Sequence, residues 1–468
     1  MAPEVDILGS SAQQQRLLMP RIRVPKPFLE LIKEIKPETF SLMGKYQITN
    51  SQGKYLHWDE FKWRVEKGDE EVAAWTATKL LRQGIAKNLI TLQAEGDRHF
   101  SYCVPNSLSA KLHSIDRMTG GGRKISDGLS MSNDDKNRYL VKSLMFEEAI
   151  TSAQLEGAST TREIAKDMLQ KGLQPKDKSQ QMILNNYLLM KKALEQKDED
   201  LSIEFILELH EIATRQAIEN NAVAGELRQH DNIVITNSYD ENSFYPPAAA
   251  TLIARLKDLC DFANTDHSDR DPNNFIHPIV KAIILHFMIG YIHPFGDGNG
   301  RTARAIFYWS IIKSGYWLFE YVSISKLIQE KRGDYDKSFI YTETDDFDLT
   351  YFIYNQVETI SKAVQLLNEY VDKKQKDFYD FMDWAKKSPI SQKLNWEQLE
   401  ILKEAVRSPG REFTAKQMSD DFGITPNTAR KHLNKLVDLN LLVESTTKVG
   451  KTVIYLAPAN LRSKLNKS

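Results

Sequence analysis

The densest run of hydrophobic residues in the chain covers residues 279–292, which read IVKAIILHFMIGYI. Apolar residues would fall on nearly every face of a helix formed by this run, and such a helix is normally buried inside a large protein. We therefore expect a buried central helix with His293 at its end. His286 inside the run and His277, just before Pro278, are interpreted as structural residues.

A second helix is expected to run from Gly300 to Gly315, over the residues GRTARAIFYWSIIKSG. Its apolar residues favour one face, and a glycine after the last turn is typical of a helix C-terminus. The two helices predict a mainly α bundle.

Upstream, the segment EEAITSAQLEGASTTREIAKDM predicts another pair of helices. Ser152 and Glu156 are four residues apart and share one helix face, and Gly157 can end that helix. Thr160 and Glu163 have the spacing of a capping box that starts the next helix.

Residues 232–236, NIVIT, are followed by the polar stretch NSYDEN and a short second arm, FYPP. A β-branched run followed by a turn-rich insert predicts a β-hairpin. Most hairpins bind no ligand, so this pattern alone assigns no function.

The N-terminal part predicts a smaller α+β unit. The first 40 or so residues are interpreted as a loosely held arm in which PFLELIKEI forms a short helix, followed by a hairpin at 45–65 and a helix at 70–88. Four aromatic residues of this part are expected in its core rather than in a ligand site: Trp58, Phe61, Trp63 and Trp75. Residues 120–124, GGGRK, lack the spacing of a phosphate-binding P-loop and predict a flexible turn.

After the segment KSPISQKLNWEQ, the C-terminal part predicts three helices, at 394–408, 414–423 and 425–443. Thr414 and Thr425 suit the N-cap positions of the last two. Two short strands are expected around Val449-Gly450.

Composition favours an ordinary multidomain protein. At about 150 residues per domain, 468 residues predict about three domains. The 62 basic and 63 acidic residues nearly cancel, so the charge of the whole chain indicates neither nucleic-acid nor membrane binding. The two cysteines offer no disulfide framework, and the sequence shows no signal peptide or membrane span, so we expect a cytoplasmic protein.

The segment between the two central helices, IHPFGDGNGRTAR at 292–304, concentrates residues that can bind phosphate. Gly298 and Gly300 allow the backbone N–H groups to approach a ligand closely. The unpaired N–H groups and the dipole at the start of the following helix attract anions. Arg301 and Arg304, on its first turn, can bind different phosphate oxygens.

Two further residues of this segment suit a phosphoryl-transfer site. Asp297 lies just before the helix, where a carboxylate can hold a magnesium ion that bridges phosphates. His293 lies at the mouth of the loop and has the near-neutral pKa that suits a general base. A histidine before proline or a DGNG turn, taken singly, is more often structural. A structural turn, however, needs neither the paired arginines nor the upstream base.

At every specified position, this segment matches the signature of the Fic family, His-x-Phe-x-Asp/Glu-Gly-Asn-Gly-Arg-x-x-Arg. The resemblance implies transfer of a nucleotide monophosphate, usually AMP from ATP, to a Ser, Thr or Tyr hydroxyl of a target protein, which can be the chain itself. It implies that His293 deprotonates the hydroxyl, that Asp297 binds Mg²⁺, and that the last arginine, Arg304, holds the γ-phosphate. The α- and β-phosphates would be held by the turn and the first arginine: Gly298, Asn299, Gly300 and Arg301.

Three other segments gain a role from the same resemblance. Ser152-x-x-x-Glu156-Gly157 resembles the family's inhibitory motif, whose glutamate pairs with Arg304 and takes the place of the γ-phosphate. The hairpin is similar in position to the family's flap, which pairs with the target and contacts the nucleotide through Ile233, Val234, Ile235 and Thr236. Tyr335 corresponds to an aromatic residue of the adenine pocket, with a core tyrosine as the alternative.

The C-terminal part resembles a winged helix-turn-helix domain over residues 395–458. Its third helix would be the recognition helix, with these residues on its exposed side: Asn427, Thr428, Arg430, Lys431 and Lys435. Residues 391–468 contain 13 Lys and Arg and 8 Asp and Glu, a net charge of +5. This charge is compatible with DNA binding and equally with protein docking.

The sequence thus predicts a mainly α Fic-type bundle with a β-hairpin flap, between an α+β N-terminal domain and a winged helix. The expected domains are 1–110, 111–385 with the inhibitory helix near 144–157, and 386–468. The favoured function is an autoinhibited protein adenylyltransferase that uses ATP and Mg²⁺. The alternative is a DNA-binding regulator whose Fic core senses nucleotide or removes AMP from a target. Another nucleotide or phosphocholine as the transferred group, and a homodimer, are left open.

Overall fold

The computed structural model describes residues 22–119, 146–218, 222–233, 245–387, 393–407, 410–445, 453–458 and 460–461. The chain divides into two compact units, one of residues 1–128 and 143–365 and the other of residues 129–142 and 366–468. The domain boundaries given above remain predictions. No helix of the described residues is both long enough and apolar enough to cross a membrane.

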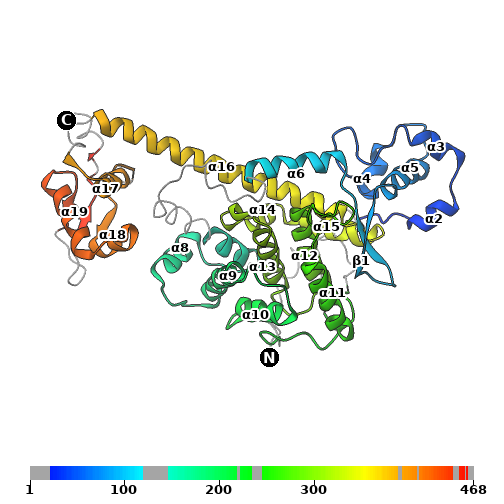
Figure 1. Ribbon diagram of the computed structural model, residues 1–468, viewed down its shortest axis with the longest axis horizontal. Coiled ribbons are helices and arrows are strands. Elements are labelled where there is room, and N and C mark those ends of the chain that lie inside the picture. Colours follow the sequence, from blue (N-terminus) through cyan, green and yellow to red (C-terminus); the bar gives the residue numbers. More distant parts are fainter. Residues whose placement is uncertain are drawn as a thin grey trace, which may run out of the picture. The chain divides into compact units, whose positions relative to one another are not determined.

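The core of the first unit is built around α12 (Pro278–Ile292) and α13 (Asn299–Lys313), which lie side by side (Figure 1). All residues of α12 except Pro278, Lys281 and Gly290 are buried, which confirms the predicted central helix. Further helices pack around this pair: α9 (Lys178–Glu195) and α10 (Ile203–Thr214) against α13, and α11 (Leu252–Asn264) against α12.

The remaining elements of this unit complete a mainly helical fold, as expected. They are α8 (Arg162–Lys171), η2 (Ala249–Thr251), η3 (Trp317–Glu320), α14 (Ser325–Glu330), α15 (Arg332–Thr344) and α16 (Thr350–Lys387), with the last running into the second unit. Residues 146–155 are also helical.

The N-terminal segment of the first unit contains small helices and one hairpin. Its elements are α2 (Phe28–Lys33), α3 (Pro37–Leu42), α4 (Trp58–Phe61), η1 (Lys62–Arg64), α5 (Glu71–Gln83), β1 (Lys87–Gln93), β2 (His99–Tyr102) and α6 (Asn106–Thr119). The predicted helices at 27–35 and 70–88 are present as α2 and α5. The antiparallel hairpin is formed by β1 and β2.

The hairpin predicted at residues 45–65 is wrong. The Asn50 side chain accepts hydrogen bonds from the N–H groups of Gln52 and Lys54 at 3.0 and 2.9 Å, which closes a local turn instead. His57 then caps α4 by accepting from the Asp59 N–H at 3.2 Å. Side chains that bind nearby backbone groups compete with strand pairing, which explains the error.

The prediction for the aromatic residues of this segment holds for three of the four. Phe61 and Trp75 are buried and Trp58 packs against them. Trp63 is 71% exposed, so its assignment to the core was wrong. The Lys62 ammonium and the Arg23 guanidinium lie 4.8 and 5.2 Å from its ring centre, a contact that suits a surface tryptophan.

A buried ionic cluster joins the N-terminal segment to the turn between α15 and α16. Lys79 of α5 pairs with Asp345 at 2.8 Å, and both side chains are at most 1% exposed. Asp345 also accepts from the Tyr351 hydroxyl at 2.7 Å, while Arg82 of α5 donates to that hydroxyl at 2.9 Å. The N-terminal segment and the central helices therefore share one folded unit.

The second unit contains the elements expected at the C-terminus. They are α17 (Trp396–Arg407), β3 (Glu412–Thr414), α18 (Ala415–Phe422), α19 (Pro426–Asp438), β4 (Val443–Glu444) and β5 (Ile454–Leu456). Thr414 and Thr425 cap α18 and α19, as predicted. The strands form an antiparallel sheet in the order β3-β5-β4, in which β3 is an addition to the predicted elements. The segment around Val449-Gly450 lies outside the described residues.

Candidate active site

The loop between α12 and α13 is held rigidly by its own residues. His293 ends α12 in the left-handed conformation, with φ 48° and ψ 58°, and Gly298 starts α13 with φ 81°. The Asn299 side chain binds both backbone groups of Phe295, accepting at 3.0 Å and donating at 2.8 Å. The amide of Asn299 thus shapes the loop.

The start of α13 has the features of an anion site. No side chain caps this helix N-terminus, although side chains cap α8, α9 and α10. A Cβ atom on Gly300 would overlap Oε1 of Glu156, so the glycine lets a carboxylate approach the first turn. Unpaired N–H groups and the helix dipole favour negative charge there.

That carboxylate belongs to Glu156 and is paired with Arg304. The Nη2 atom of Arg304 donates to Glu156 Oε1 at 2.8 Å, and its Nε atom donates to Ser152 Oγ at 2.9 Å. Burial opposes ionisation of Glu156, but the charge and hydrogen bond of Arg304 outweigh it and hold the pKa of Glu156 below its usual value. The structure therefore brings together Ser152, Glu156 and Arg304, which the sequence separates by about 150 residues.

The helix at 146–155 is anchored by a second carboxylate, Glu148, which the sequence analysis did not single out. Glu148 is 3% exposed and accepts from the Ser325 N–H and hydroxyl at 3.1 and 2.6 Å, and from the Ser323 hydroxyl at 2.8 Å. Gly157, with φ 97°, ends the helix as predicted. These contacts fix the position of Glu156.

The capping box predicted for the next helix was wrong by one residue. Thr161 is the N-cap of α8, and its hydroxyl accepts from the Ile164 N–H. The carbonyl of Thr160 accepts instead from the Gln154 side chain at 3.1 Å, which places Thr160 before the helix.

Arg301 and Asp297 are paired with each other beside the loop. Arg301 is 2% exposed and donates to Asp297 Oδ1 at 3.2 Å and to the Ala213 carbonyl at 2.7 Å. The Asp297 side chain is 22% exposed. The described residues contain no group of three or more His, Cys, Asp or Glu that could hold a metal. One accessible carboxylate still suits Mg²⁺, which usually keeps several waters and binds substrate phosphates.

His293 is in the protonation state that a general base needs. Burial lowers its pKa to about 4, helped by the charge of Arg228, so the imidazole is neutral at pH 7. Its Nδ1 atom faces the Gly290 carbonyl at 3.4 Å. This contact favours the proton on Nδ1, which leaves Nε2 able to accept one.

Two residues that support the loop were missed by the sequence analysis. His210 accepts from the Gly225 N–H through Nδ1 at 3.0 Å, so Nε2 carries the proton and donates to the Asp297 carbonyl at 2.9 Å. Its ring stacks on Phe295 with 3.7 Å between centroids. Arg228 contacts the His293 carbonyl. Neither the residues around Arg228 nor the helical pattern around His210 gave a signal for these contacts.

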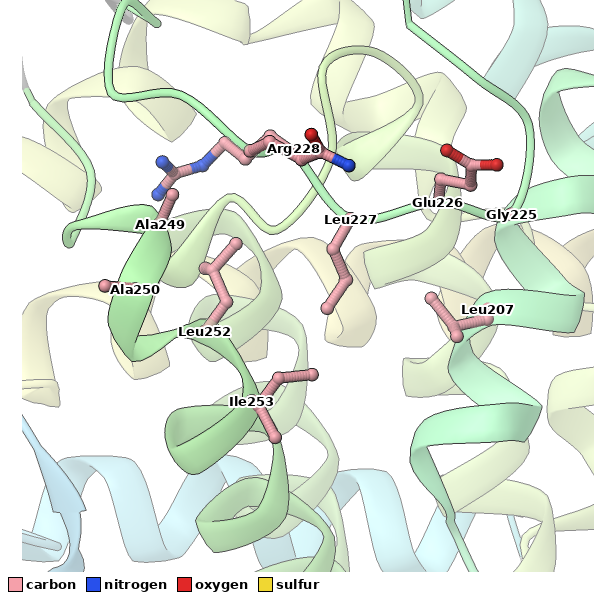
Figure 2. A pocket seen from close by; sticks show the side chains of 10 residues that line it. Leu207, Gly225, Glu226, Leu227, Arg228, Ala249, Ala250, Leu252 and Ile253 are labelled. Atoms are coloured by element: carbon pink, nitrogen blue, oxygen red, sulfur yellow. The ribbon is translucent and has the colours of Figure 1, made fainter.

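The predicted flap is described only at its ends. Ile233 is half-buried, whereas Val234, Ile235 and Thr236 lie outside the described residues. Behind the two ends, a cavity of about 620 Å³ opens between α10 and α11 (Figure 2). Its larger apolar side chains are Leu207, Leu227, Leu252 and Ile253.

Tyr335 lies on α15, near the ion pair of Glu156 and Arg304. Its hydroxyl and its ring both contact residues of the helical core. Its hydroxyl lies 3.1 Å from Nε2 of His286, and its ring contacts Phe339 and Phe352. The residue is half-buried, so its role in an adenine pocket remains a prediction. His286 is buried, as expected for a structural residue, and His277 caps α12.

In the second unit, the residues predicted to face DNA lie on α19. Asn427, Arg430, Lys431 and Lys435 are exposed, and Thr428 is half-buried, with its hydroxyl 2.9 Å from that of Thr425. The buried residues of α19 are Ala429, Leu433 and Leu436, on the other side of the helix.

Comparison with known proteins agrees with this geometry. Residues 200–311 match the Fic/DOC family. The chain is 31% identical over 123 residues to protein adenylyltransferase fic-1 of Caenorhabditis elegans, covering 26% of this chain and 22% of the relative. It is 27% identical over 184 residues to protein adenylyltransferase Fic of Nematostella vectensis, covering 38% and 39%. The chain thus matches well under half of the length of these relatives.

A solved structure supports the fold. The crystal structure of a Fic family protein from Desulfovibrio desulfuricans aligns with a TM-score of 0.50 and 18% identity, over 76% of this chain and 98% of that chain. Together these findings support a Fic domain in this chain and confirm the mainly helical Fic-type fold.

Proposed function

We propose that the Fic domain of this chain transfers AMP from ATP to a hydroxyl side chain of a protein, and that Glu156 restrains this activity. The observation that carries the proposal is the ion pair between Glu156 and Arg304 at the start of α13. A carboxylate there occupies a place suited to a phosphate, and its charge repels the triphosphate of ATP.

The residues around the loop support each part of the reaction. Neutral His293 can accept the proton of the target hydroxyl through Nε2, while the hydroxyl oxygen attacks the α-phosphorus of ATP. The new P–O bond forms as the bond to the β-phosphate oxygen breaks, and pyrophosphate leaves. Arg301, Arg304 and the N-terminus of α13 lie where they would stabilise the phosphate charges.

Asp297 is the residue that would hold Mg²⁺. When bound, the ion would neutralise charge on the phosphates of ATP. Arg301 would keep its hydrogen bond to Ala213 and so keep the guanidinium beside the turn.

The proposal is tested with the Glu156→Gly protein, Mg²⁺ and ATP labelled separately at the α- and γ-phosphates, alone and with cell lysate. Label from the α position is expected on protein and is expected to disappear in Glu156→Gly/His293→Ala. Glu163→Gly is the matched control, because Glu163 is an exposed glutamate on the first turn of α8. Label from the γ position alone would indicate a kinase-like reaction and exclude this function.

For the second unit we propose contact with DNA through α19. Three exposed cations, Arg430, Lys431 and Lys435, project from a helix whose opposite side is buried, which is the arrangement of a recognition helix. A duplex-binding assay at several salt concentrations tests it, as set out in the Discussion.

A further inference from the structure

Arg228 makes an unusual set of contacts beside the loop. Its side chain is 3% exposed, and it donates through Nε to the His293 carbonyl at 2.8 Å and through Nη1 to the His230 carbonyl at 3.2 Å. Its Nη2 atom donates to the Pro247 carbonyl, and Figure 2 shows the guanidinium reaching toward Ala249. One side chain therefore joins the catalytic loop to both ends of the flap segment.

A carboxylate strengthens the same junction. Asp231 Oδ1 accepts from Arg228 Nη1 at 3.1 Å and from the Ala249 N–H at 2.6 Å. The backbone N–H of Arg228 also donates to the Pro294 carbonyl at 2.9 Å. The two ends of the flap segment, at 228–231 and 247–249, are thus tied to each other and to residues 293–294.

Only an arginine suits this position. Its planar guanidinium presents five donors in a fixed fork, whereas lysine presents three donors on one atom. Burying the guanidinium is unfavourable and lowers the pKa of Arg228, with Asp231 opposing that shift. Asp231 is 63% exposed, so carbonyl groups rather than a buried counter-ion satisfy most of the donors.

The contact with His293 acts on a constrained residue. A non-glycine residue with φ 48° needs support from its surroundings, and the held carbonyl belongs to that residue. Fixing this peptide group fixes the direction in which the imidazole leaves the backbone. The hydrogen bonds of the Arg228 side chain described here go to residues 230, 231, 247 and 293, all outside the phosphate-facing segment 298–304.

We propose that Arg228 is a positioning residue that fixes the base His293 and both ends of the flap segment relative to one another. A target hydroxyl can then reach Nε2 of His293. This inference rests on the proposed function. It requires that loss of Arg228 impairs transfer to protein while ATP binding is preserved, because these contacts of Arg228 lie outside the phosphate-facing segment 298–304.

The test uses Arg228→Gln and Arg228→Lys in the active Glu156→Gly background. Both are expected to lower kcat for AMP transfer by about 10- to 100-fold, the effect of misplacing a reacting group by about 1 Å, and to leave the Kd for Mg-ATP within about twofold. Arg255→Gln is the matched control, because Arg255 is a half-buried arginine of α11 that also donates to a carbonyl, that of Gln93. It is expected to retain the parent rate.

The pH profile separates positioning from a loss of charge. Among the described residues, the charged groups that act most strongly on the His293 imidazole in this background are Arg228 and Asp297. Arg228→Gln removes a cation and should move the acidic limb of kcat to higher pH, whereas Arg228→Lys should lower kcat without that shift. Unchanged kcat in both variants, or an equal loss of ATP binding, would overturn the proposal.

Hydrogen exchange keeps the two proposals apart. If the Glu156→Gly parent transfers no AMP, the proposed function fails, and hydrogen exchange of the amides of Ala248, Ala249 and Ala250 then decides on the positioning role of Arg228 alone. Faster exchange of these amides in Arg228→Gln, with unchanged exchange of the α12 and α13 amides, supports the positioning role of Arg228. Exchange equal to that of the parent refutes it.

Discussion

Nη2 of Arg304 lies 2.8 Å from Oε1 of Glu156, across 148 positions of sequence. The arginine that the phosphates of ATP would need is therefore already paired with a carboxylate of the same chain. Because that carboxylate also lies against the first turn of α13, we propose that access of ATP depends on the helix at 146–155.

This restraint should be insensitive to pH in the neutral range. The pKa of Glu156 is lowered from an ordinary value of 4.5, so the ion pair is fully present above that value and is lost only as pH falls through the lowered pKa. We expect the ratio of labelling rates for Glu156→Gly and the unaltered protein to stay constant between pH 6 and 8. A ratio that falls steadily across this range would point to a different titrating group.

Glu156→Gln should distinguish the effect of the negative charge of Glu156 from the effect of its hydrogen bond with Arg304. The amide can still accept a hydrogen bond from Arg304 but no longer repels phosphate, so we expect labelling between that of the unaltered protein and that of Glu156→Gly. A charge-assisted hydrogen bond contributes about 1.5–3 kcal/mol, which corresponds to a change of about 10- to 100-fold. Labelling equal to that of Glu156→Gly would show that charge alone causes the restraint.

Glu148→Gln should weaken the attachment of the helix at 146–155 while leaving the residues of the Glu156–Arg304 ion pair unchanged. The buried carboxylate accepts three hydrogen bonds from Ser323 and Ser325, and an amide would face some of these donors with its own N–H groups. We expect a loss of about 1–3 kcal/mol in stability, with basal labelling raised about fivefold or more. Thermal unfolding and α-labelled ATP measure the two effects, with Glu163→Gln as control. A lower Tm with unchanged labelling would show that Glu148 stabilises the fold without contributing to the restraint by Glu156.

Because of His293, the acidic limb of the pH–rate profile should lie at a much lower pH than an ordinary histidine would give. Protonated His293 cannot accept the hydroxyl proton, and burial places its pKa at about 4, compared with 6.5 for an unperturbed side chain. The charge of Glu156 raises this pKa, so in Glu156→Gly the limb of kcat/KM should lie at or below pH 4, and kcat/KM should be flat from pH 6 to 7.5. A limb centred near 6.5 would show that the imidazole becomes solvated when substrates bind.

The salt dependence of DNA binding tests α19. Each phosphate contact contributes about one power of salt concentration to the affinity, so Arg430→Ala, Lys431→Ala and Lys435→Ala should each reduce the slope of log K against log salt by about 0.9. Lys403→Ala on α17 should leave the slope unchanged. A flat salt response of the unaltered protein would count against DNA contact.

The sequence predicted the local parts of the site well, because local signals determine them. The continuous apolar run predicted α12, the glycines indicated the turn, and Gly157 indicated the end of the helix at 146–155. The errors also have local causes: Asn50 and His57 bind backbone groups in a segment whose alternation indicated strands. Likewise, Thr161 rather than Thr160 caps α8.

What could not be predicted are contacts made by single side chains with distant carbonyl groups. Arg228 binds the carbonyl of His293 and His210 binds that of Asp297, 65 and 87 positions away. A carbonyl group is present on every residue, so no pattern of residue types indicates which one a side chain will reach. Such contacts become visible only when the helices are packed together.

The buried pair of Lys79 and Asp345 has a consequence for how the protein can be divided. A fragment that starts after α5 would keep the complete phosphate-binding signature, yet it would leave Asp345 buried without its cation. Breaking a buried ion pair from one side typically costs about 3–5 kcal/mol, a large part of the stability of an ordinary domain. The N-terminal segment therefore contributes to the stability of the central helices, and a stable fragment that carries the phosphate-binding signature should include it.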